Sequence, residues 1–337
     1  MENTNIVIKS IGRYIPEKVV TNDFFIDHFK KEEWGGKEIT GLLSKLGRDE
    51  RHIADRCESS LTMGVASAKN ALEKSNLSVK DIDMIVFVSD TPEYTVPSNA
   101  VMIHQRIGAE NAHTVFDMNC NCTGMIVAMD NIASFMKVHD NIKNTLLVGS
   151  FHASSVVRFD DAFTYGTFGD ASVSMILSKE NDEDIKGVLD SKYFTNSNYC
   201  ELSRYPACGS MESLLGKQHK YYRRLEYVPF DANLFVESFT KSINELFKEH
   251  NISDNDVAYY AFSQLYNGAN IDVFEKLDIE PDEKYLFIAD KYGYTGCTSP
   301  MLALSTVWDD IDKYKGKYII IISVAVGFST SAVLYKI

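Results

Sequence analysis

The chain of 337 residues has no apolar run long enough to cross a bilayer. One of its longest runs is 318–326, whereas a membrane-spanning helix needs about 20 apolar residues. The N-terminal segment also lacks a cationic stretch followed by an apolar core. We therefore expect no signal peptide, no membrane association and a cytoplasmic protein.

The sequence is also short of positive charge. Lys and Arg together number 34, against 47 Asp and Glu, which gives a formal net charge of −13. Because nucleic acids and anionic membranes bind cationic surfaces, we expect neither as a partner. Hydrophobic residues make up 45% of the chain, which is enough for a substantial folded core.

Cysteine is scarce, and its spacing does not suit a metal. There are six cysteines, and without an export signal a reducing compartment is the default, so we expect no disulfides. Cys120 and Cys122 are only two positions apart, and no second close pair or His-x₃-His follows them. We therefore expect no metal site.

Strand and helix patterns alternate along the chain, which is typical of α/β proteins. In the first half they predict helices at 59–75, 97–107 and 122–138, and strands at 84–88, 114–118 and 145–149. In the second half they predict strands at 258–262, 285–289 and 318–323. Each half closes with a β-rich segment, at 171–177 and at 331–336.

The two halves also share residues at a constant spacing. After a shift of 175 positions, four residues of the first half match four of the second: Asn76, Ser78, Asp81 and Phe87 match Asn251, Ser253, Asp256 and Phe262. The pair 123–124 is echoed by 295–296. We interpret the chain as two duplicated units, 1–180 and 181–337; the alternative is chance similarity.

Duplication has a consequence for the position of a site. A pseudo-twofold axis brings equivalent loops of the two halves to a shared centre. If Cys122 begins a helix in the first half, its counterpart around 293–297 is expected to face it. Residues 263–267, which follow a predicted strand, are expected nearby.

The segment 116–125 is the most informative in the chain, because it predicts a strand, a tight turn and a helix rich in small residues. A cysteine at a helix start lies against unpaired N–H groups and the positive end of the helix dipole, and both favour the nucleophilic thiolate. The same N–H groups can stabilise an oxyanion. From these residues alone, Cys122 is equally well explained as a nucleophile or as an inert buried cysteine, whereas Cys120 is better explained as inert.

Four segments resemble motifs of one family. They are its opening at 10–22, its first active-site loop at 90–98, its nucleophile motif at 117–124 and its Phe-Gly-Asp-Gly turn at 168–171. The whole chain resembles β-ketoacyl-acyl-carrier-protein synthase III, of the thiolase-like superfamily. This resemblance implies a five-layered α-β-α-β-α fold with internal duplication, usually as a homodimer. It also implies that Cys122 takes an acyl group from a coenzyme A thioester, which is a substrate, with no permanently bound cofactor.

The chain departs from that family at two catalytic positions. Family members use a histidine and an asparagine to stabilise the enolate formed when a malonyl thioester loses CO₂. In those motifs this chain has Ser263 and Tyr294. Serine has no accessible pKa for acid–base work, and tyrosine donates one hydrogen bond but fills more space. Since losing one aimed donor costs about 10²–10³ in rate, ordinary decarboxylative condensation is disfavoured.

Other expectations also rest on the resemblance. The family's Gly-Gly-Gly turn appears as 325–327, so we expect the backbone N–H groups of Cys122 and Val326 to be the oxyanion donors. The expected substrate-binding residues are Trp34, which resembles an adenine-stacking tryptophan, Val96, which resembles a residue that gates the neighbouring subunit's acyl pocket, and Phe328.

Two further segments bear on the partner and the pocket. The helix that docks acidic carrier proteins in this family keeps only Lys276 of its cations here, so carrier steering is expected to be weak. The basic segment 217–224 is either a substitute docking patch or a solvated loop. We expect 191–225 to be an irregular cover over the pocket.

Three hypotheses follow. The first is an atypical ketosynthase III-like acyltransferase or condensing enzyme, which carries an acyl group from acyl-coenzyme A or an acyl carrier protein on Cys122. Its acceptor would belong to fatty-acid-like, polyketide or other specialised-metabolite biosynthesis. The second is a non-catalytic subunit paired with an active homologue, and the third is a conventional 3-oxoacyl-acyl-carrier-protein synthase III. We expect a homodimer, with a heterodimer with a paralogue as the alternative.

Overall fold

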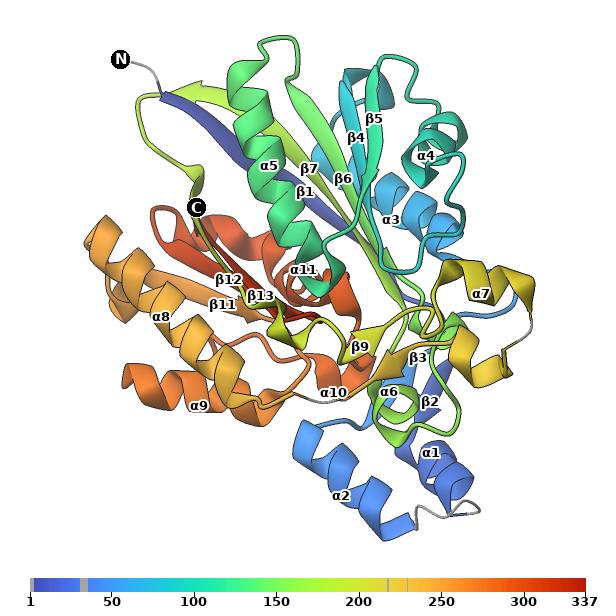
Figure 1. Cartoon of the computed structure of the whole chain (residues 1–337). Helices are drawn as coiled ribbons and strands as arrows, with labels where there is room; N and C mark the ends of the chain where they lie inside the picture. The colour runs from blue at the N-terminus through green and yellow to red at the C-terminus, as the bar shows by residue number, and fades with distance from the viewer. Residues whose placement is uncertain (1–2, 31–35, 217, 229) are drawn as a thin grey trace.

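The computed structural model describes residues 3–30, 36–216, 218–228 and 230–337, which form two α/β halves around one mixed sheet (Figure 1). The sheet has nine strands in the order β11-β12-β13-β8-β1-β7-β6-β4-β5. Two ribbons, β2 with β3 and β9 with β10, are separate from it. Among the described residues, no helix combines the length and apolarity that a membrane span requires.

The main elements divide between the halves. Those of the first half are β1 (Asn3–Tyr14), α3 (Ser60–Ser75), β4 (Met84–Val88), α4 (Asn99–Ile107), β5 (Thr114–Met118), α5 (Gly124–Val138), β6 (Asn144–Phe151) and β7 (Ala171–Asp182). Those of the second half are β8 (Gly187–Thr195), α8 (Asn233–His250), β11 (Val257–Phe262), α9 (Asn267–Leu277), α10 (Ala289–Tyr292), α11 (Ser299–Ser305), β12 (Tyr318–Ala325) and β13 (Ser329–Lys336).

Shorter elements lie in the connections. They are β2 (Val19–Thr21), α1 (Asn22–Phe29), α2 (Gly36–Leu46), β3 (Glu50–His52), α6 (Ala162–Thr167), β9 (Ser203–Arg204), α7 (Ser210–Leu215) and β10 (Glu226–Tyr227). The predicted strands at 84–88 and 114–118 are confirmed, and those at 145–149, 258–262 and 318–323 are each slightly longer in the structure. The three predicted helices are confirmed as α3, α4 and α5.

The two half-sheets join where β1 and β8 pair in parallel at a single position, Ile6 with Gly187. Gly187 has a φ of +80°, and a Cβ there would collide with the Ile6 carbonyl oxygen. Only glycine allows this backbone contact without strain. The junction of the two halves therefore depends on the absence of a side chain at this position.

Helices and half-sheets alternate in five layers. α5 and α11 contact strands of both half-sheets and form the central layer. α3 and α4 cover the outer face of the first half-sheet, and α8 lies against the outer face of the second, packed beside α9 (Figure 1). The expected five-layered α-β-α-β-α architecture is confirmed.

Strands buried on both faces explain the apolar runs of the sequence. In β4, Met84 and Val86 face the central layer, whereas Ile85 and Phe87 face the outer helices. The isoleucines of β12 divide in the same way between the central and the outer core. Each half-sheet therefore contributes to two cores, and the central core is shared.

The residues that match at a spacing of 175 make the same local structure in each half. Asn76 ends α3 and Asn251 ends α8, and both take the left-handed conformation, with φ of 60° and 52°. Ser78 and Ser253 then each form a capping box with the aspartate three residues later. We keep the division at 1–180 and 181–337 as a proposal, and the link between β7 and β8 lies at its boundary.

The predicted strand at 285–289 is wrong. Tyr285 makes only an isolated parallel bridge with Tyr260, and α10 begins at Ala289. The side-chain amide of Gln264 donates to the Leu286 carbonyl at 2.9 Å and accepts from the Ile288 N–H at 3.0 Å. Because a side chain satisfies these backbone groups, no further strand pairing forms here.

Candidate active site

Cys122 lies at the entrance to the central helix α5. After β5, the backbone turns through Asn121 at a φ of 50°, and Cys122 is the middle residue of a single 3-10 turn. Asparagine tolerates this left-handed conformation, and the Asn119 side chain accepts the Asn121 N–H at 2.8 Å. The Thr123 hydroxyl donates to the Cys120 carbonyl at 2.8 Å and closes the turn. This local geometry places Cys122 at the expected helix start.

The second half repeats this turn around Cys297. Gly296 takes a φ of 55°, and the Thr298 hydroxyl donates to the Thr295 carbonyl at 2.8 Å. The two turns contact each other, as the pseudo-twofold relation predicted. Cys297 is therefore the counterpart of Cys122 at the same spacing of 175 residues.

One detail of the predicted repeat is wrong. We matched 123–124 with 295–296 by the shared letters Thr-Gly, but the counterpart of Thr123 is Thr298. The error is three positions, because a glycine in the second half takes the turn position that an asparagine takes in the first. The spacing of 175 residues therefore holds through the turn. The different spacing of 172 residues implied by our Thr-Gly match was an error.

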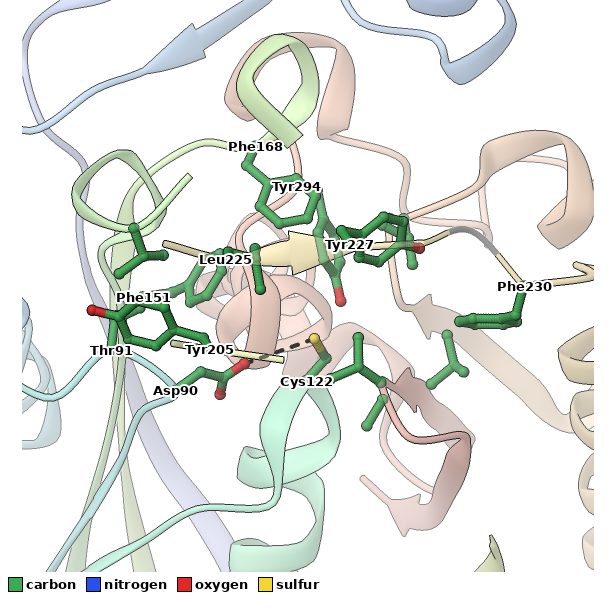
Figure 2. Close-up of a pocket in the computed structure, with 15 residues that line it drawn as sticks. Asp90, Thr91, Cys122, Phe151, Phe168, Tyr205, Leu225, Tyr227, Phe230 and Tyr294 are labelled. Atoms are coloured by element: carbon green, nitrogen blue, oxygen red, sulfur yellow. Dashed lines mark hydrogen bonds between the residues drawn. The ribbon is translucent and has the colours of Figure 1, made fainter. Parts of the chain in front are cut away.

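The Cys122 sulfur borders a cavity of about 50 Å³ between the two halves (Figure 2). The lining comes from both halves and from the connection before α8, and it is mostly apolar. It consists of Asp90, Thr91, Cys122, Phe151, Val156, Phe168, Tyr205, Leu225, Tyr227, Phe230, Leu265, Tyr294, Val324, Ala325 and Val326. The free space is that of a few water molecules, which suits a small group on the sulfur.

The thiol of Cys122 is held in its neutral form. Burial raises its pKa above the ordinary value, and the negative charge of Asp90 raises it further. The Tyr294 hydroxyl and the backbone N–H groups of Cys122 and Val326 act in the opposite direction, because their dipoles favour negative charge on the nearby sulfur. The expectation that the helix start favours the thiolate is therefore wrong for the resting site, since burial outweighs it.

Asp90 is a site residue that the sequence did not single out. Its Oδ2 lies 3.9 Å from the Cys122 sulfur, and its Oδ1 is sealed from solvent without a hydrogen bond (Figure 2). Burial raises the pKa of Asp90 to about 7, and its contact with Cys122 opposes this shift. The available signal was a carboxylate just after the wholly apolar strand β4.

Tyr294 occupies the centre of the cavity wall. Its N–H donates to the Thr167 carbonyl at 2.9 Å and its carbonyl accepts from Gly169 at 3.0 Å, which fixes it against the turn 168–171. Its hydroxyl faces the Cys122 sulfur, and no hydrogen bond of ordinary geometry reaches that hydroxyl from the described residues. Burial raises the pKa of Tyr294 well above its ordinary value, so the hydroxyl stays protonated.

Ser263 lies next to Tyr294 and is not part of the cavity wall. It follows β11, its N–H donates to the Ile322 carbonyl at 2.9 Å, and its hydroxyl is buried without a partner among the described residues. The structure thus brings Ser263 and Tyr294 to the same region, but only Tyr294 contacts the cavity.

The three predicted substrate-binding residues are placed differently. Val96 is 84% exposed on the loop before α4, away from the cavity of its own chain. Phe328 is buried behind Phe230, with their rings 5.5 Å apart, and only Phe230 lines the cavity. Trp34 lies outside the described residues.

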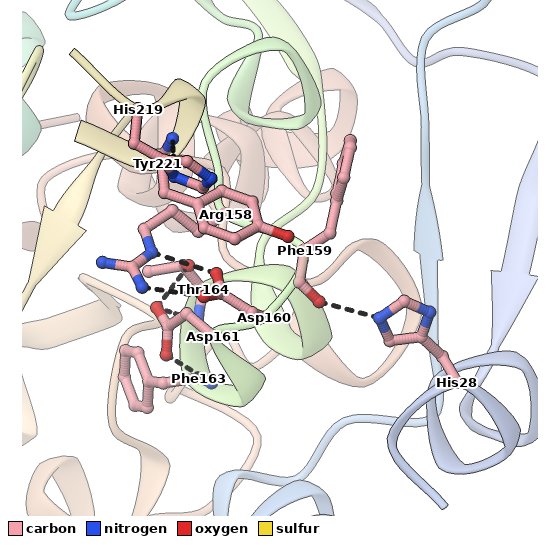
Figure 3. Close-up of polar contacts among 9 residues, drawn as sticks. All are labelled: His28, Arg158, Phe159, Asp160, Asp161, Phe163, Thr164, His219 and Tyr221. Carbon is pink, nitrogen blue, oxygen red and sulfur yellow. Dashed lines mark hydrogen bonds and ion pairs between the residues drawn. The ribbon is translucent and has the colours of Figure 1, made fainter. Parts of the chain in front are cut away.

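The connection at 196–225 contributes to the cover, as expected, because Tyr205 and Leu225 line the cavity. The expectation is wrong for 191–195, which ends strand β8 and pairs with β13. The described part of the basic segment, 218–224, packs on the turn before α6 (Figure 3). There Arg158 pairs with Asp160 at 2.8 Å and lies 5.4 Å from the ring of Tyr221. Tyr221 and Arg224 therefore hold this segment against the fold, whereas residues 218–220, 222 and 223 are exposed.

A second, larger cavity of about 520 Å³ adjoins the first. Lys18, Phe24 and Tyr165 are among the residues that line it, and Phe168 lines both cavities. Phe168 therefore separates the Cys122 cavity from the larger space. Within the described parts of the chain, no cluster of His, Cys, Asp and Glu side chains has the composition of a metal site.

Two duplicated α/β halves with a buried cysteine at the start of a central helix define a thiolase-like protein. Residues 116–197 match the family described as 3-oxoacyl-[acyl-carrier-protein (ACP)] synthase III, and residues 247–337 match its C-terminal part. Together these segments make up just over half of the chain. The chain belongs to the 3-oxoacyl-[acyl-carrier-protein] synthase III family.

Individual relatives agree along the full length. The chain is 27% identical over 334 residues to a β-ketoacyl-[acyl-carrier-protein] synthase III of Aliarcobacter butzleri, covering 97% of this chain and 96% of the relative. The crystal structure of 3-oxoacyl-[acyl-carrier-protein] synthase III from Aquifex aeolicus superposes with a TM-score of 0.83 at 26% identity, covering 99% of this chain and 100% of that one. The priming β-ketosynthase of the R1128 polyketide pathway has the same fold, with a TM-score of 0.86 at 20% identity, covering 100% and 97%.

Proposed function

We propose that this chain is an acyl-transfer enzyme that takes an acyl group from a thioester onto Cys122 and passes it to an acceptor. One observation carries the proposal: the backbone N–H groups of Cys122 and Val326 lie near the sulfur that borders the cavity and both lower the pKa of its thiol. An acyl carbonyl bound to that sulfur lies within hydrogen-bonding range of the same two donors. Stabilisation of an oxyanion by two backbone N–H groups is the usual aid to acyl transfer.

The proposed donor is a thioester of coenzyme A or of an acyl carrier protein, and no cofactor stays bound. Relatives named for the acyl carrier protein support this choice. The small volume next to Cys122 favours a short acyl chain, and the larger cavity beyond Phe168 offers room for the rest of the thioester. We place the reaction in fatty-acid-like, polyketide or other specialised-metabolite biosynthesis.

The proposed enzyme is atypical in its acceptor step. By the family resemblance, Ser263 and Tyr294 stand where a histidine and an asparagine stabilise an enolate. Ser263 does not contact the cavity, and the Tyr294 hydroxyl faces the sulfur. These placements support transfer that does not depend on enolate stabilisation, and they make a conventional synthase III the weaker candidate.

The second candidate is a non-catalytic subunit that pairs with an active homologue. The observation in its favour is the raised pKa of the buried Cys122 thiol, which leaves little thiolate at neutral pH. We propose a homodimer for the enzyme and a heterodimer with a paralogue for this alternative. The exposed Val96 supports either assembly, since a partner chain would cover this apolar side chain.

The test is the intact mass of the purified chain after incubation with acyl-coenzyme A thioesters from acetyl to octanoyl. Cys122→Ala removes the proposed nucleophile, and Cys297→Ala is the matched control, because Cys297 occupies the equivalent buried turn outside the cavity. We expect an acyl adduct in the wild type and in Cys297→Ala, and none in Cys122→Ala. A folded wild-type chain that forms no adduct with any donor would overturn the enzyme proposal and favour the non-catalytic subunit.

A further inference from the structure

The sheet itself brings Asp90 and Cys122 together. β4 and β5 pair in parallel, and Val88 at the end of β4 lies opposite Met118 at the end of β5. Asp90 follows the first strand and Cys122 follows the second, so both are placed at the same edge of the sheet. Side chains that follow neighbouring parallel strands commonly form the sites of open α/β sheets.

The loop around Asp90 is fixed by hydrogen bonds that do not involve its carboxylate. The Ser89 hydroxyl accepts the Thr91 N–H at 3.0 Å, and the Thr91 hydroxyl accepts the His152 N–H at 2.9 Å. Among the described residues, the carboxylate has one polar contact, the Cys122 sulfur 3.9 Å from Oδ2, while Oδ1 is buried without a partner. A buried carboxylate without a structural partner is costly, which points to a functional role.

The cavity contains no other group that can take a proton at neutral pH. Among its described lining residues there is no Lys, Arg or His. The titratable groups that face Asp90 are Cys122, Cys120, Cys297 and Tyr294, and Tyr205 and Tyr227 line the same cavity. Burial raises the pKa values of all six of these thiols and phenols, so they remain protonated.

We propose that Asp90 is the general base and acid of the Cys122 site, and that the acceptor it serves is a neutral alcohol, amine or thiol. This inference rests on the proposed acylation of Cys122. A general base must lie within contact of the proton that it removes, and distances in a site without substrate are often longer than those in the reacting complex. The Cys122 sulfur and Asp90 Oδ2 are in contact at 3.9 Å, and the proposed proton transfer requires this distance to shorten in the reacting complex.

In the first step, the Asp90 carboxylate takes the thiol proton as the sulfur attacks the thioester carbonyl. The new S–C bond forms, the old C–S bond breaks, and the proton passes from Asp90 to the departing thiolate. In the second step, an acceptor X–H attacks the acyl carbonyl while Asp90 takes its proton. The bond between the Cys122 sulfur and the acyl carbon then breaks, and the sulfur receives that proton from Asp90. The net reaction converts an acyl thioester and X–H into acyl-X and a free thiol.

The same carboxylate selects against a malonyl thioester as acceptor. Such an acceptor carries its own carboxylate into an apolar cavity that already contains Asp90. No cation among the described lining residues offsets the two negative charges, and like charges in a low dielectric repel strongly. A neutral acceptor with a removable proton avoids this repulsion and uses Asp90 directly.

The first arm of the test needs no acyl donor. The rate of Cys122 alkylation by iodoacetamide is measured by mass between pH 5.5 and 8.5 in the wild type, Asp90→Asn, Asp90→Glu and the control Glu93→Gln, which removes an exposed charge from the same loop. We expect the wild-type and Glu93→Gln rates to fall together as pH drops through about 7. We expect Asp90→Asn to be at least about tenfold slower at pH 7.5 without that midpoint, and Asp90→Glu to regain part of the rate. An Asp90→Asn rate equal to or above the wild-type rate would overturn the base role.

The second arm uses the acyl-enzyme. Acylated wild-type chain is exposed to small neutral alcohols, amines and thiols, or to malonyl-coenzyme A, and loss of the adduct is followed with the mass of the product. We expect a neutral acceptor to take the acyl group from Cys122. We expect the rate of this transfer to fall about 10²-fold or more in Asp90→Asn. Discharge by malonyl-coenzyme A alone, with release of CO₂, would overturn the acceptor class. If alkylation depends on Asp90 but no donor acylates the wild type, the proposed acyl-transfer function fails. The role of Asp90 as the base that deprotonates Cys122 is then still supported.

Discussion

Cys122 and Cys297 are equivalent residues of the two halves, each in the middle of a 3-10 turn that begins a central helix. Only Cys122 borders the cavity. The Cys297 sulfur is buried against the ends of β4 and β6. It lies 3.9 Å from the Val88 carbonyl and 4.0 Å from the Ser150 carbonyl. Duplication has thus produced two turns of one geometry, and the surrounding residues leave a cavity beside only one of the two cysteines.

Tyr294→Phe tests the hydroxyl that faces the Cys122 sulfur. Because this hydroxyl lowers the pKa of the Cys122 thiol, its removal takes a favourable dipole away from the sulfur during attack, and we expect acyl-enzyme formation to slow about tenfold. Stability should not fall, since the hydroxyl has no hydrogen-bond partner to lose. The measurements are the acylation time course by mass and the free energy of unfolding in urea.

The matched variant for stability is Tyr260→Phe, outside the cavity. Its hydroxyl donates to the Asp254 carboxylate at 2.8 Å, so its removal is expected to cost about 1.5 kcal/mol or more. If Tyr294→Phe is destabilised as much as Tyr260→Phe, the Tyr294 hydroxyl has a structural partner and its proposed role fails.

Phe168→Leu tests the wall between the two cavities. Phe168 lines both, so a smaller side chain is expected to connect them and to shift the preferred donor towards longer acyl chains. The ratio of octanoyl to acetyl adduct after a fixed time measures the shift, and we expect it to rise at least about tenfold, in keeping with several buried methylenes. Phe274→Leu, the same change in the outer core, should leave the ratio unchanged. An equal ratio in all three proteins would show that Phe168 does not limit the chain length.

Gly187→Ala tests the junction of the half-sheets. The added methyl would collide with the Ile6 carbonyl and would hold alanine at a φ of +80°, so we expect a loss of more than about 2 kcal/mol in the free energy of unfolding. Gly216→Ala is the matched control, because its φ is +66° but the new methyl meets no atom of the described, non-adjacent residues within 4 Å. It should cost about 1 kcal/mol. Equal losses in the free energy of unfolding at both positions would show that the contact of residue 187 with the Ile6 carbonyl does not add to the cost of a side chain.

Asp90→Asn tests the buried carboxyl through stability alone. The folded-state pKa of about 7 lies above the ordinary value of 3.8, so the native state binds a proton that the unfolded chain has released. The wild type therefore loses stability as pH rises from about 4 to 7, and the full penalty is present above 7. We expect Asp90→Asn to be more stable than the wild type by about 1–3 kcal/mol at pH 8, with no difference near pH 4.

Glu93→Gln, which removes an exposed charge from the same loop, should stay within about 0.5 kcal/mol of the wild type at both pH values. Urea unfolding at pH 4 and pH 8 provides the comparison. A pH-independent difference between Asp90→Asn and the wild type would mean that the carboxyl is not titrating near neutral pH.

Local patterns were sufficient for much of the fold. Strands buried on both faces appear as short apolar runs, which is why β4 and β12 were found close to their observed bounds. The segment 285–289 has a similar composition, yet it does not pair as a strand. Its backbone groups are taken by the side chain of Gln264, more than twenty positions earlier in the chain, and no periodicity records that contact.

The candidate site divides in the same way. The contiguous strand, turn and helix drew attention to Cys122 but left an inert cysteine equally plausible, and the family resemblance decided between the two interpretations. Asp90 was not singled out, because its contact with Cys122 depends on which strands pair in the sheet. The charge state of the thiol was mispredicted for a related reason, since the helix start is a local feature but burial is a property of the folded chain.

The most direct test of the account locates the acyl group on the protein. The wild-type chain is incubated with the donor that gives the largest mass increase, then digested, and the modified peptide is sequenced by tandem mass spectrometry. The account predicts an acyl group on Cys122, with Cys120 and the equivalent Cys297 unmodified. An acyl group on another residue, or none on a folded chain with any donor, would contradict it.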